Sequence, residues 1–201
     1  MNDVNLQNLL IFNKEVTLAK ALITGGSGFI GSHLTDHLLG QGYRVRVLDA
    51  LVSQVHGNDA RRPAFLSREA EFVAGDIRDP DTVKKAVKGI DAVVHLAATV
   101  GVGQSMYQIR HYTEVNAVGT AVLLEALTHH SIERLVVASS MSIYGEGMYK
   151  TAAGETVENA ERSVSQLKGK RWELYGDDEE QLFPIATPET KAPALASVYA
   201  L

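Results

Sequence analysis

The sequence lacks cysteine altogether, has few aromatic residues and contains no long apolar run. Without cysteine, the 201-residue chain has no disulfide framework, no thiol nucleophile and no zinc–thiolate site. No apolar run is long enough to span a bilayer, and residues 1–15 lack the basic and then apolar layout of a signal peptide. The net charge of −5 gives no support for binding nucleic acid or an anionic membrane. We therefore expect a cytoplasmic protein without nucleic-acid partner, membrane partner or metal site.

What the sequence does have is a glycine-rich turn at residues 24–31, Thr-Gly-Gly-Ser-Gly-Phe-Ile-Gly. It follows an apolar segment, 18–24, that is typical of a buried strand, and it precedes apolar residues at helical spacing up to Gly40. Residues without a Cβ let a pyrophosphate approach the amides at a helix N-terminus, where the helix dipole favours negative charge. The glycine spacing matches the dinucleotide-binding fingerprint. We expect cofactor contacts from Gly25, Gly28, Phe29, Ile30 and Gly31.

An acidic residue follows this turn at the position expected for contact with an adenosine ribose. Segment 43–49 reads as a second strand that ends in Asp49, about 20 residues after the turn. A purely structural turn is the plain alternative, and Asp49 favours the dinucleotide interpretation over it. Because its carboxylate would repel a 2′-phosphate, the sequence predicts NAD and not NADP as the cofactor. We interpret Arg44 and Arg46, which alternate along the same strand, as solvated charges.

Strand and helix patterns alternate along the following part of the chain. Further strands are expected at 71–75, 92–97 and 135–139, with helices at 81–88 and, in one or two pieces, at 107–130. This alternation predicts an α/β fold, a Rossmann-type doubly wound parallel sheet with helices on both faces. Ligands of such sheets bind beyond the carboxyl ends of the strands, so functional residues are expected just after those ends.

Two segments fall outside the alternating pattern. Residues 1–16 read as an N-terminal extension ahead of a cofactor-binding domain that we expect over residues 17–201. Residues 145–197 read as a polar insertion in that domain, with a possible hairpin around Gly176 and an acidic run at 177–180 that we interpret as solvated surface. A loop of this length is usually functional or disordered.

Five motifs follow one another in a characteristic order. They are the turn at 24–31, Gly75-Asp76-Ile77-Arg78-Asp79, His95-Leu96-Ala97-Ala98, Asn116-Ala117-Val118-Gly119-Thr120, and Ser139-Ser140 followed by Tyr144-Gly145. Together they resemble the extended short-chain dehydrogenase/reductases, in particular the NAD-dependent nucleotide-sugar epimerase/dehydratase family, from about residue 18 to residue 201. The resemblance implies further cofactor contacts from Asp76, Ile77, Leu96, Ala97, Ala98 and Asn116. We interpret His95 as a hydrogen-bonded core histidine and not as a base.

Within this resemblance, the catalytic pair falls on Ser140 and Tyr199. Tyr199, as a phenolate, would take the proton of the sugar hydroxyl, and Ser140 would orient the reacting oxygen. The plain alternative for Ser140 is a helix cap. The resemblance also implies that the nucleotide-sugar substrate lies near Gly103, Gln104, Ser105, Met141 and Ser142.

The resemblance implies an isomerase that inverts C4 of a nucleotide-activated hexose through transient oxidation to a keto-sugar. Dehydratases of the family usually carry Thr-Asp-Glu at the serine segment, and Ser140-Met141-Ser142 cannot replace that acid and base. This difference favours an epimerase, with a dehydratase or a reductase as the alternative. The serine segment and residues 100–106 look similar to dTDP-L-rhamnose 4-epimerase-like members of the family.

The chain departs from the family pattern at its C-terminal end. The lysine of the family's Tyr-x-x-x-Lys motif would fall at position 203, and the substrate domain is missing. We therefore expect an inactive N-terminal piece of a longer enzyme, which the resemblance implies is a homodimer. An NAD-binding module without turnover stays open as the alternative, and neither the nucleotide nor the sugar is determined.

Overall fold

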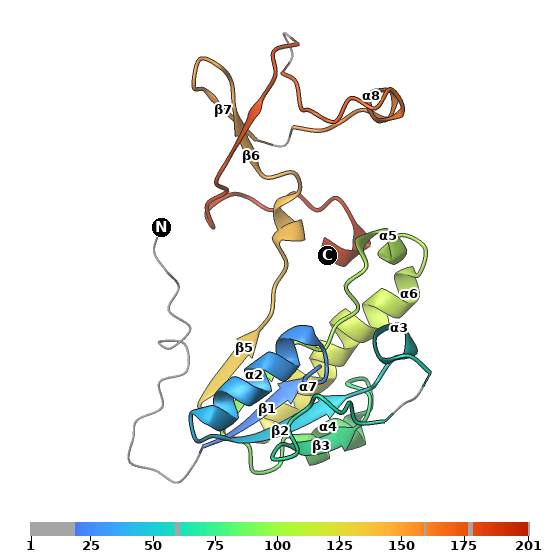
Figure 1. Ribbon diagram of the computed structural model, residues 1–201, viewed down its shortest axis with the longest axis vertical. Coiled ribbons are helices and arrows are strands. Elements are labelled where there is room, and N and C mark those ends of the chain that lie inside the picture. The colour runs from blue at the N-terminus through green and yellow to red at the C-terminus, as the bar shows by residue number, and fades with distance from the viewer. Residues whose placement is uncertain (1–18, 59–60, 159, 177–178, 201) are drawn as a thin grey trace. The chain divides into compact units, whose positions relative to one another are not determined.

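The structure is a computed structural model that describes residues 19–58, 61–158, 160–176 and 179–200 (Figure 1). It divides into two compact units. Unit 1 runs to Thr99 and resumes over Arg110–Ala138, and unit 2 comprises Val100–Ile109 and the chain from Ser139 onward. Within these residues no helix is long and apolar enough to cross a membrane. The extension predicted at 1–16 lies outside the described residues.

Unit 1 is built around a five-stranded parallel sheet with the strand order β3-β2-β1-β4-β5. The strands are β1 (Lys20–Thr24), β2 (Arg44–Asp49), β3 (Glu71–Ala74), β4 (Ala92–His95) and β5 (Arg134–Val137). The direction of the strand order reverses between β1 and β4, which is where doubly wound sheets bind their ligands. The five predicted strands and the predicted Rossmann-type sheet are confirmed.

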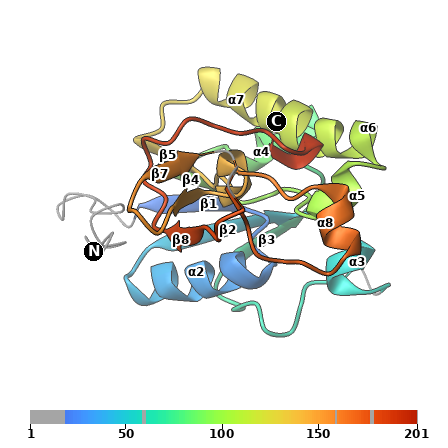
Figure 2. The ribbon, with the colours of Figure 1, turned by 90° about the horizontal axis from the view of Figure 1, so that it is seen from above.

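Helices cover both faces of this sheet, one on one side and two on the other (Figure 2). They are α2 (Phe29–Gly40), α4 (Pro80–Ala86) and α7 (Gly119–Thr128). Alternate strand residues point to opposite faces. Leu22 of β1 therefore packs with α4 and α7 in one buried cluster, whereas Ala21 and Ile23 pack with α2 in another. Burial on both faces explains why the strands read as nearly continuous apolar runs.

The helical stretch predicted at 107–130 forms three consecutive pieces. They are α6 (Ile109–Tyr112), the π-helix η1 (Thr113–Val118) and α7. The sequence predicted one or two helical pieces and did not predict the π-helix. A π-helix of only six residues barely changes the spacing of apolar residues along the sequence, so the pattern contains no sign of it. π-Helical turns are rare in proteins overall, and those that occur are often found at functional sites. A further short helix of unit 1, α3 (Ser53–His56), was also not predicted.

Arg46 is not the solvated charge that its place in an alternating pattern predicted. It is only 9% exposed, because β2 is an inner strand. Its guanidinium donates to the carbonyls of Ala86 and Lys88 at 2.6 and 2.9 Å, and it forms an ion pair with Glu71 at 2.9 Å. Arg46 thus satisfies carbonyls that the C-terminus of α4 leaves free. Arg44 is exposed, as predicted.

The first two apolar residues of α2 do not belong to its buried face. Phe29 and Ile30 are 81% and 67% exposed. The buried face begins instead with small residues, Gly31, Ser32 and Thr35, before it reaches Leu38. Small residues are needed there because the backbone of the glycine turn lies directly against the helix.

Unit 2 contains a small antiparallel sheet where the sequence predicted a polar insertion. The strand β6 (Met148–Lys150) pairs with β7 (Thr156–Glu158) on one side and with β8 (Phe183–Ile185) on the other. The other elements of this unit are α5 (Val102–Ser105), η2 (Met141–Tyr144), α8 (Val164–Lys168) and η3 (Val198–Ala200). Strands of three residues with polar neighbours carry too little periodicity to be recognised in the sequence.

The hairpin predicted around Gly176 is confirmed. Tyr175 pairs with Gln181, and the amide of Gly176 donates to the carbonyl of Glu180 at 2.9 Å. On either side of it, Leu174 and Leu182 are each 1% exposed, and they are joined by a backbone hydrogen bond of 2.8 Å. The hairpin therefore has a small apolar base. Residues 177 and 178 of the acidic run lie outside the described residues.

Candidate cofactor site and catalytic pair

The glycine turn between β1 and α2 is shaped by two close approaches of the backbone. Gly25 has a φ of +69°, and a Cβ there would lie 2.8 Å from the amide nitrogen of Ala97. A Cβ on Gly31 would lie 2.5 Å from both the carbonyl oxygen of Gly25 and the Cα of Gly26. Gly31 therefore allows α2 to lie directly against the glycine turn.

The N-terminus of α2 is left without a side-chain cap. Its N-cap residue is Gly28, which offers no side-chain acceptor, and the first turn carries no acidic residue. The first amides of a helix have no partner within the helix, and the helix dipole favours an anion there. Phe29 and Ile30 contribute two of these amides. The arrangement suits a pyrophosphate, as predicted from the glycine spacing.

Asp49 connects the end of β2 to the glycine turn. Its Oδ2 accepts a hydrogen bond from the amide of Ser27 at 2.9 Å, and its Oδ1 accepts one from the amide of Leu51 at 2.8 Å. Leu51 adopts a φ of +49°, a left-handed conformation that is uncommon for a leucine. His56 lies 3.6 Å from the same carboxylate. Each carboxylate oxygen keeps a second lone pair, so ribose hydroxyls can still bind.

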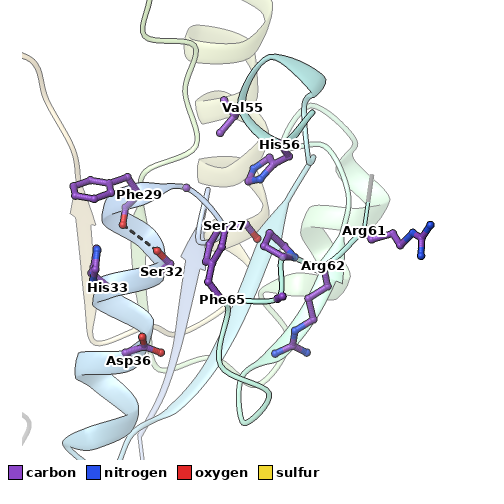
Figure 3. Close-up of a pocket in the computed structure, with 13 residues that line it drawn as sticks. Ser27, Phe29, Ser32, His33, Asp36, Val55, His56, Arg61, Arg62 and Phe65 are labelled. Carbon is purple, nitrogen blue, oxygen red and sulfur yellow. Dashed lines mark hydrogen bonds between the residues drawn. The ribbon is translucent and has the colours of Figure 1, made fainter. Parts of the chain in front are cut away.

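Ser27 and His56, which both contact the Asp49 carboxylate, line a cavity of about 800 Å³. Figure 3 shows the residues that line this cavity. Helix α2 lines it on one side, through Ser32, His33 and Asp36, and residues 61–65 line it on the other. The Ser27 hydroxyl is buried and has no hydrogen-bond partner among the described residues. A buried hydroxyl without a partner is costly, so the cavity fits a ligand with polar groups at this point.

The sequence did not single out Ser27. Ser27 occupies a position of the glycine motif at which any residue is allowed. Its location between Gly26 and Gly28 is the one feature of the sequence that could have indicated a ligand contact.

At the end of β4, His95 lies in a chain of buried hydrogen bonds whose hydrogens can be assigned. The hydroxyl of Thr120 donates to the carbonyl of Asn116 at 2.6 Å. The Thr120 oxygen therefore accepts from Nε2–H of His95 at 2.9 Å. Nδ1 of His95 is then the acceptor for the hydroxyl of Thr24 at 2.6 Å. His95 is the neutral core histidine that was predicted, and burial lowers its pKa.

Thr24 extends this chain of hydrogen bonds to the segment that follows β4. Its oxygen accepts the amides of Leu96 and Ala97, both at 3.2 Å. The backbone of Leu96 and Ala97 is also what lies close to Gly25. The next residue, Ala98, is exposed. Thr24 thus holds the predicted cofactor residues of β4 beside the glycine turn.

Asn116, in the π-helix, holds the same segment from the other side. Its Oδ1 accepts from the amide and the hydroxyl of Thr99 at 2.8 and 3.1 Å, and its Nδ2 donates to the carbonyl of Thr99 at 3.0 Å. The amide group of Asn116 is therefore largely used in fixing the chain just after Ala98. The cofactor contact predicted for Asn116 stays a prediction.

The residues after β3 have separate structural tasks. Asp76 pairs with Arg78 at 2.6 Å, and this side-chain hydrogen bond lowers the pKa of the Asp76 carboxyl. Ile77 is buried and packs against Gly119. A Cβ on Gly119 would lie 2.6 Å from the Cγ2 of Ile77. This contact explains the glycine of the Asn-x-x-Gly-Thr motif. The cofactor roles of Asp76 and Ile77 stay predictions.

Unit 2 brings the two predicted catalytic residues onto neighbouring short helices. Ser140 caps η2, and its Oγ accepts from the amide of Ser142 at 3.1 Å, so the structure contains the helix cap that was the alternative to a catalytic role. This bond leaves the hydroxyl hydrogen of Ser140 available to a ligand. The catalytic role of Ser140 stays a prediction. Tyr199 lies in η3, which packs against η2, and a hydrogen bond of 2.7 Å from Ala194 to Ile143 joins the two segments.

The residues predicted to bind the substrate lie in unit 2 as well, in different environments. Met141 is 84% exposed and Gly103 is exposed, whereas Gln104 and Ser142 are partly exposed. Ser105 differs from the others because it is fully buried. None of these positions has a contact that tests the predicted role.

The model of the "NAD dependent epimerase/dehydratase family" matches residues 21–167, which is most of the chain. This chain belongs to that family. The match spans the glycine turn, Asp49, the buried His95 chain and Ser140. NAD is thus the cofactor of the family to which this turn and carboxylate belong.

Relatives and solved structures of this family agree in activity but are longer. A dTDP-L-rhamnose 4-epimerase of Burkholderia thailandensis is 35% identical over 88% of this chain and 47% of its own length. A UDP-glucose 4-epimerase of Yersinia enterocolitica is 39% identical over 62% of this chain and 38% of its own length. The crystal structure of the Thermus thermophilus UDP-glucose 4-epimerase with NAD is similar with a TM-score of 0.63 and 31% identity, over 90% of this chain and 46% of that one. The chain spans about half or less of the length of these proteins.

Proposed function

We propose that this chain serves an NAD-dependent epimerase that inverts C4 of a nucleotide-activated hexose. The observation that carries the proposal is the placement of Ser140 and Tyr199 on two packed short helices of one unit. It is supported by membership of the family and by the activities named for the relatives.

NAD, when bound, supplies the redox chemistry by taking a hydride from the sugar carbon and giving it back. The amides at the start of α2 hold the pyrophosphate, and Asp49 accepts the hydroxyls of the adenosine ribose. The unpartnered hydroxyl of Ser27 offers a further polar contact beside this ribose. Gly25 and Gly31 keep side chains out of the turn, so that the phosphates can reach the backbone.

The proton of the reaction is handled by the residues of unit 2. Tyr199 takes the proton of the C4 hydroxyl and returns a proton to the same oxygen after the keto-sugar has turned over. The hydroxyl of Ser140 donates its hydrogen bond to that oxygen and orients it. With serine and methionine at positions 140–142, the segment lacks the acid and base that elimination of water would need, which favours an epimerase over a dehydratase.

For the substrate we propose a dTDP-activated deoxyhexose in preference to UDP-glucose. The alignment with the dTDP-L-rhamnose 4-epimerase covers 88% of this chain, so it must include much of segment 145–197. The sequence alignment with the UDP-glucose 4-epimerase of Yersinia enterocolitica covers only 62% of this chain. The structure of the Thermus thermophilus UDP-glucose 4-epimerase matches 90% of this chain, so the preference rests on the sequence alignments and not on the fold. The small sheet of unit 2 lies within segment 145–197.

The test is an epimerase assay of this chain with NAD and either dTDP-L-rhamnose or UDP-glucose, with the products separated by chromatography. The proposal predicts that the dTDP-sugar is the substrate converted, and any turnover by these 201 residues would overturn the expectation of an inactive piece. Tyr199→Phe should lower the rate by about 100-fold and Ser140→Ala by about 10-fold or more. The matched control is Tyr107→Phe, since Tyr107 is 88% exposed in the same unit. Full activity of Tyr199→Phe would contradict the proposed mechanism, and turnover of UDP-glucose alone would contradict the proposed substrate.

A second candidate function is an NAD-binding module without turnover. It is favoured by one observation, that the chain spans 47% or less of the length of the relatives described above. NAD binding in a calorimeter, together with no conversion of either sugar nucleotide, would support this second function over the first.

A further inference from the structure

Ser105 is a buried serine whose hydroxyl joins two distant segments of unit 2. Its exposed fraction is 0%. Its Oγ is 2.6 Å from the carbonyl oxygen of Val102 and 3.2 Å from the amide nitrogen of Tyr199. The helices that carry the two residues, α5 and η3, pack against each other. The contact therefore links the loop after β4 to the predicted catalytic tyrosine.

The direction of both hydrogen bonds follows from the chemistry of a hydroxyl. The carbonyl of Val102 can only accept, so the single hydrogen of Ser105 is used there. The amide of Tyr199 can only donate, so the Ser105 oxygen accepts from it. Both partners are backbone groups, which means that Ser105 fixes the path of the chain at Tyr199 and not a side chain.

We propose that Ser105 is a positioning residue that sets the backbone of Tyr199, and with it the place of the phenol oxygen. This inference rests on the proposed function, in which Tyr199 moves the proton. A phenol oxygen lies far from its own Cα, so a small rotation of the backbone displaces it by a large amount. Displacements of about 1 Å in a reacting group are enough to slow catalysis strongly.

This role differs from the sugar contact that the resemblance implied for Ser105. The Ser105 hydroxyl is fully buried and its one hydrogen is already donated to Val102, so it has no hydrogen left to donate to a sugar. Gly103 and Gln104 of the same short helix are more accessible and fit a substrate contact better. Tyr199 itself is partly exposed, so its phenol can reach a ligand while its amide is held.

The test is the hydrogen exchange rate of the Tyr199 amide in this chain, measured by NMR, in the wild type and in Ser105→Ala. We expect exchange to become about 10-fold faster in the variant, because the amide loses its acceptor. The Tyr199 ring signals should shift or broaden at the same time. The exchange rates of two other amides serve as internal references. The amide of Ser105 donates to the carbonyl of Gly101, and the amide of Ala200 donates to the carbonyl of Ser197.

The matched control is Ser163→Ala. Ser163 also lies in unit 2, and its hydroxyl also accepts a backbone amide, that of Gln166 at 3.1 Å. This variant should speed exchange at Gln166 and leave Tyr199 unchanged. Ser105→Thr, which restores a hydroxyl, should return the Tyr199 exchange rate and ring signals toward those of the wild type.

The epimerase assay gives the second readout. Positioning predicts that Ser105→Ala lowers kcat by about 10-fold and leaves KM for the sugar nucleotide within about two-fold, with partial recovery in Ser105→Thr. A raised KM at unchanged kcat would mean that Ser105 binds the sugar, and it would overturn the inference. Unchanged exchange at Tyr199, or equally faster exchange at both reference amides, would overturn it too. A fully active Tyr199→Phe would instead remove the proposed function and leave the exchange result standing.

Discussion

The two units differ in the kind of functional residue that they carry. Every residue predicted to bind the cofactor lies in unit 1, and every residue predicted to act in catalysis or to bind the substrate lies in unit 2. The predicted cofactor residues of unit 1 lie where buried strands meet helices and backbone atoms come into contact. The predicted catalytic and substrate residues of unit 2 lie in or beside helices of three or four residues that single hydrogen bonds connect.

This difference determines which substitutions each unit can accept at its predicted site. In unit 1 the limits are steric, because a Cβ in the wrong place meets backbone. In unit 2 the limits are polar, because a hydroxyl or an amide without its partner lets a short segment shift. The predictions below separate the two situations, and they run from the largest expected effect to the smallest.

The largest effect is expected for Gly31→Ala. The new Cβ would lie 2.5 Å from two backbone atoms of the glycine turn, which cannot move without opening the turn. We expect the free energy of unfolding to fall by about 3 kcal/mol and the affinity for NAD to fall by more than about 100-fold. Chemical denaturation and calorimetry measure the two quantities.

The matched control for this change is Gly40→Ala in the same helix. A Cβ on Gly40 would meet no atom within 4 Å, so stability should change by less than about 1 kcal/mol and NAD affinity should stay the same. If both variants lost NAD binding equally, the close approach at Gly31 would not be the cause.

A smaller and more local effect is expected for Leu182→Ala in unit 2. Leu182 is 1% exposed at the base of the hairpin, and its truncation should cost about 2 kcal/mol of local stability. Amide exchange should become faster through the small sheet, whereas NAD affinity should not change, because the residues predicted to bind the cofactor belong to unit 1. Leu195→Ala, at a position that is 52% exposed, is the control. A loss of NAD affinity in Leu182→Ala would contradict the division of roles.

The difference between the two units also explains why the sequence predicted the structure of unit 1 better than that of unit 2. Unit 1 was predictable because both faces of its sheet are buried, so its strands are apolar throughout, and because its turn needs glycines at fixed spacing. The strands of unit 2 escaped prediction because three residues carry no recognisable period. Arg46 was misinterpreted because an alternating charge on a strand looks solvated until the neighbouring helix is known. The contact of Ser105 with Tyr199 is a tertiary contact, and local sequence contains no signal for it.

The smallest effect is a dependence of stability on pH that arises from His95. Burial lowers its pKa below the ordinary value of 6.5. As the pH falls below 6.5, the unfolded chain binds a proton that the folded chain does not bind, so this contribution to stability is complete above pH 6.5 and is lost below it. The loss is at most about 1.4 kcal/mol per pH unit.

Denaturation curves between pH 7.5 and 5 measure this dependence. The wild type should lose stability more steeply than His95→Asn, which cannot titrate at this position. Equal slopes for the wild type and His95→Asn would contradict the neutral assignment of His95 in its hydrogen-bond chain.

The central claim is that Asp49 and the glycine turn select NAD, and calorimetric titration of this chain with NAD and with NADP tests it most directly. We expect NAD to bind at least about 10-fold more tightly than NADP, because the Asp49 carboxylate repels a 2′-phosphate. Asp49→Asn should reduce that ratio, whereas Asp36→Asn, which removes a charge from the cavity lined by Ser27 and His56, should preserve it. Equal affinities in the wild type, or a ratio that Asp49→Asn leaves unchanged, would contradict the claim.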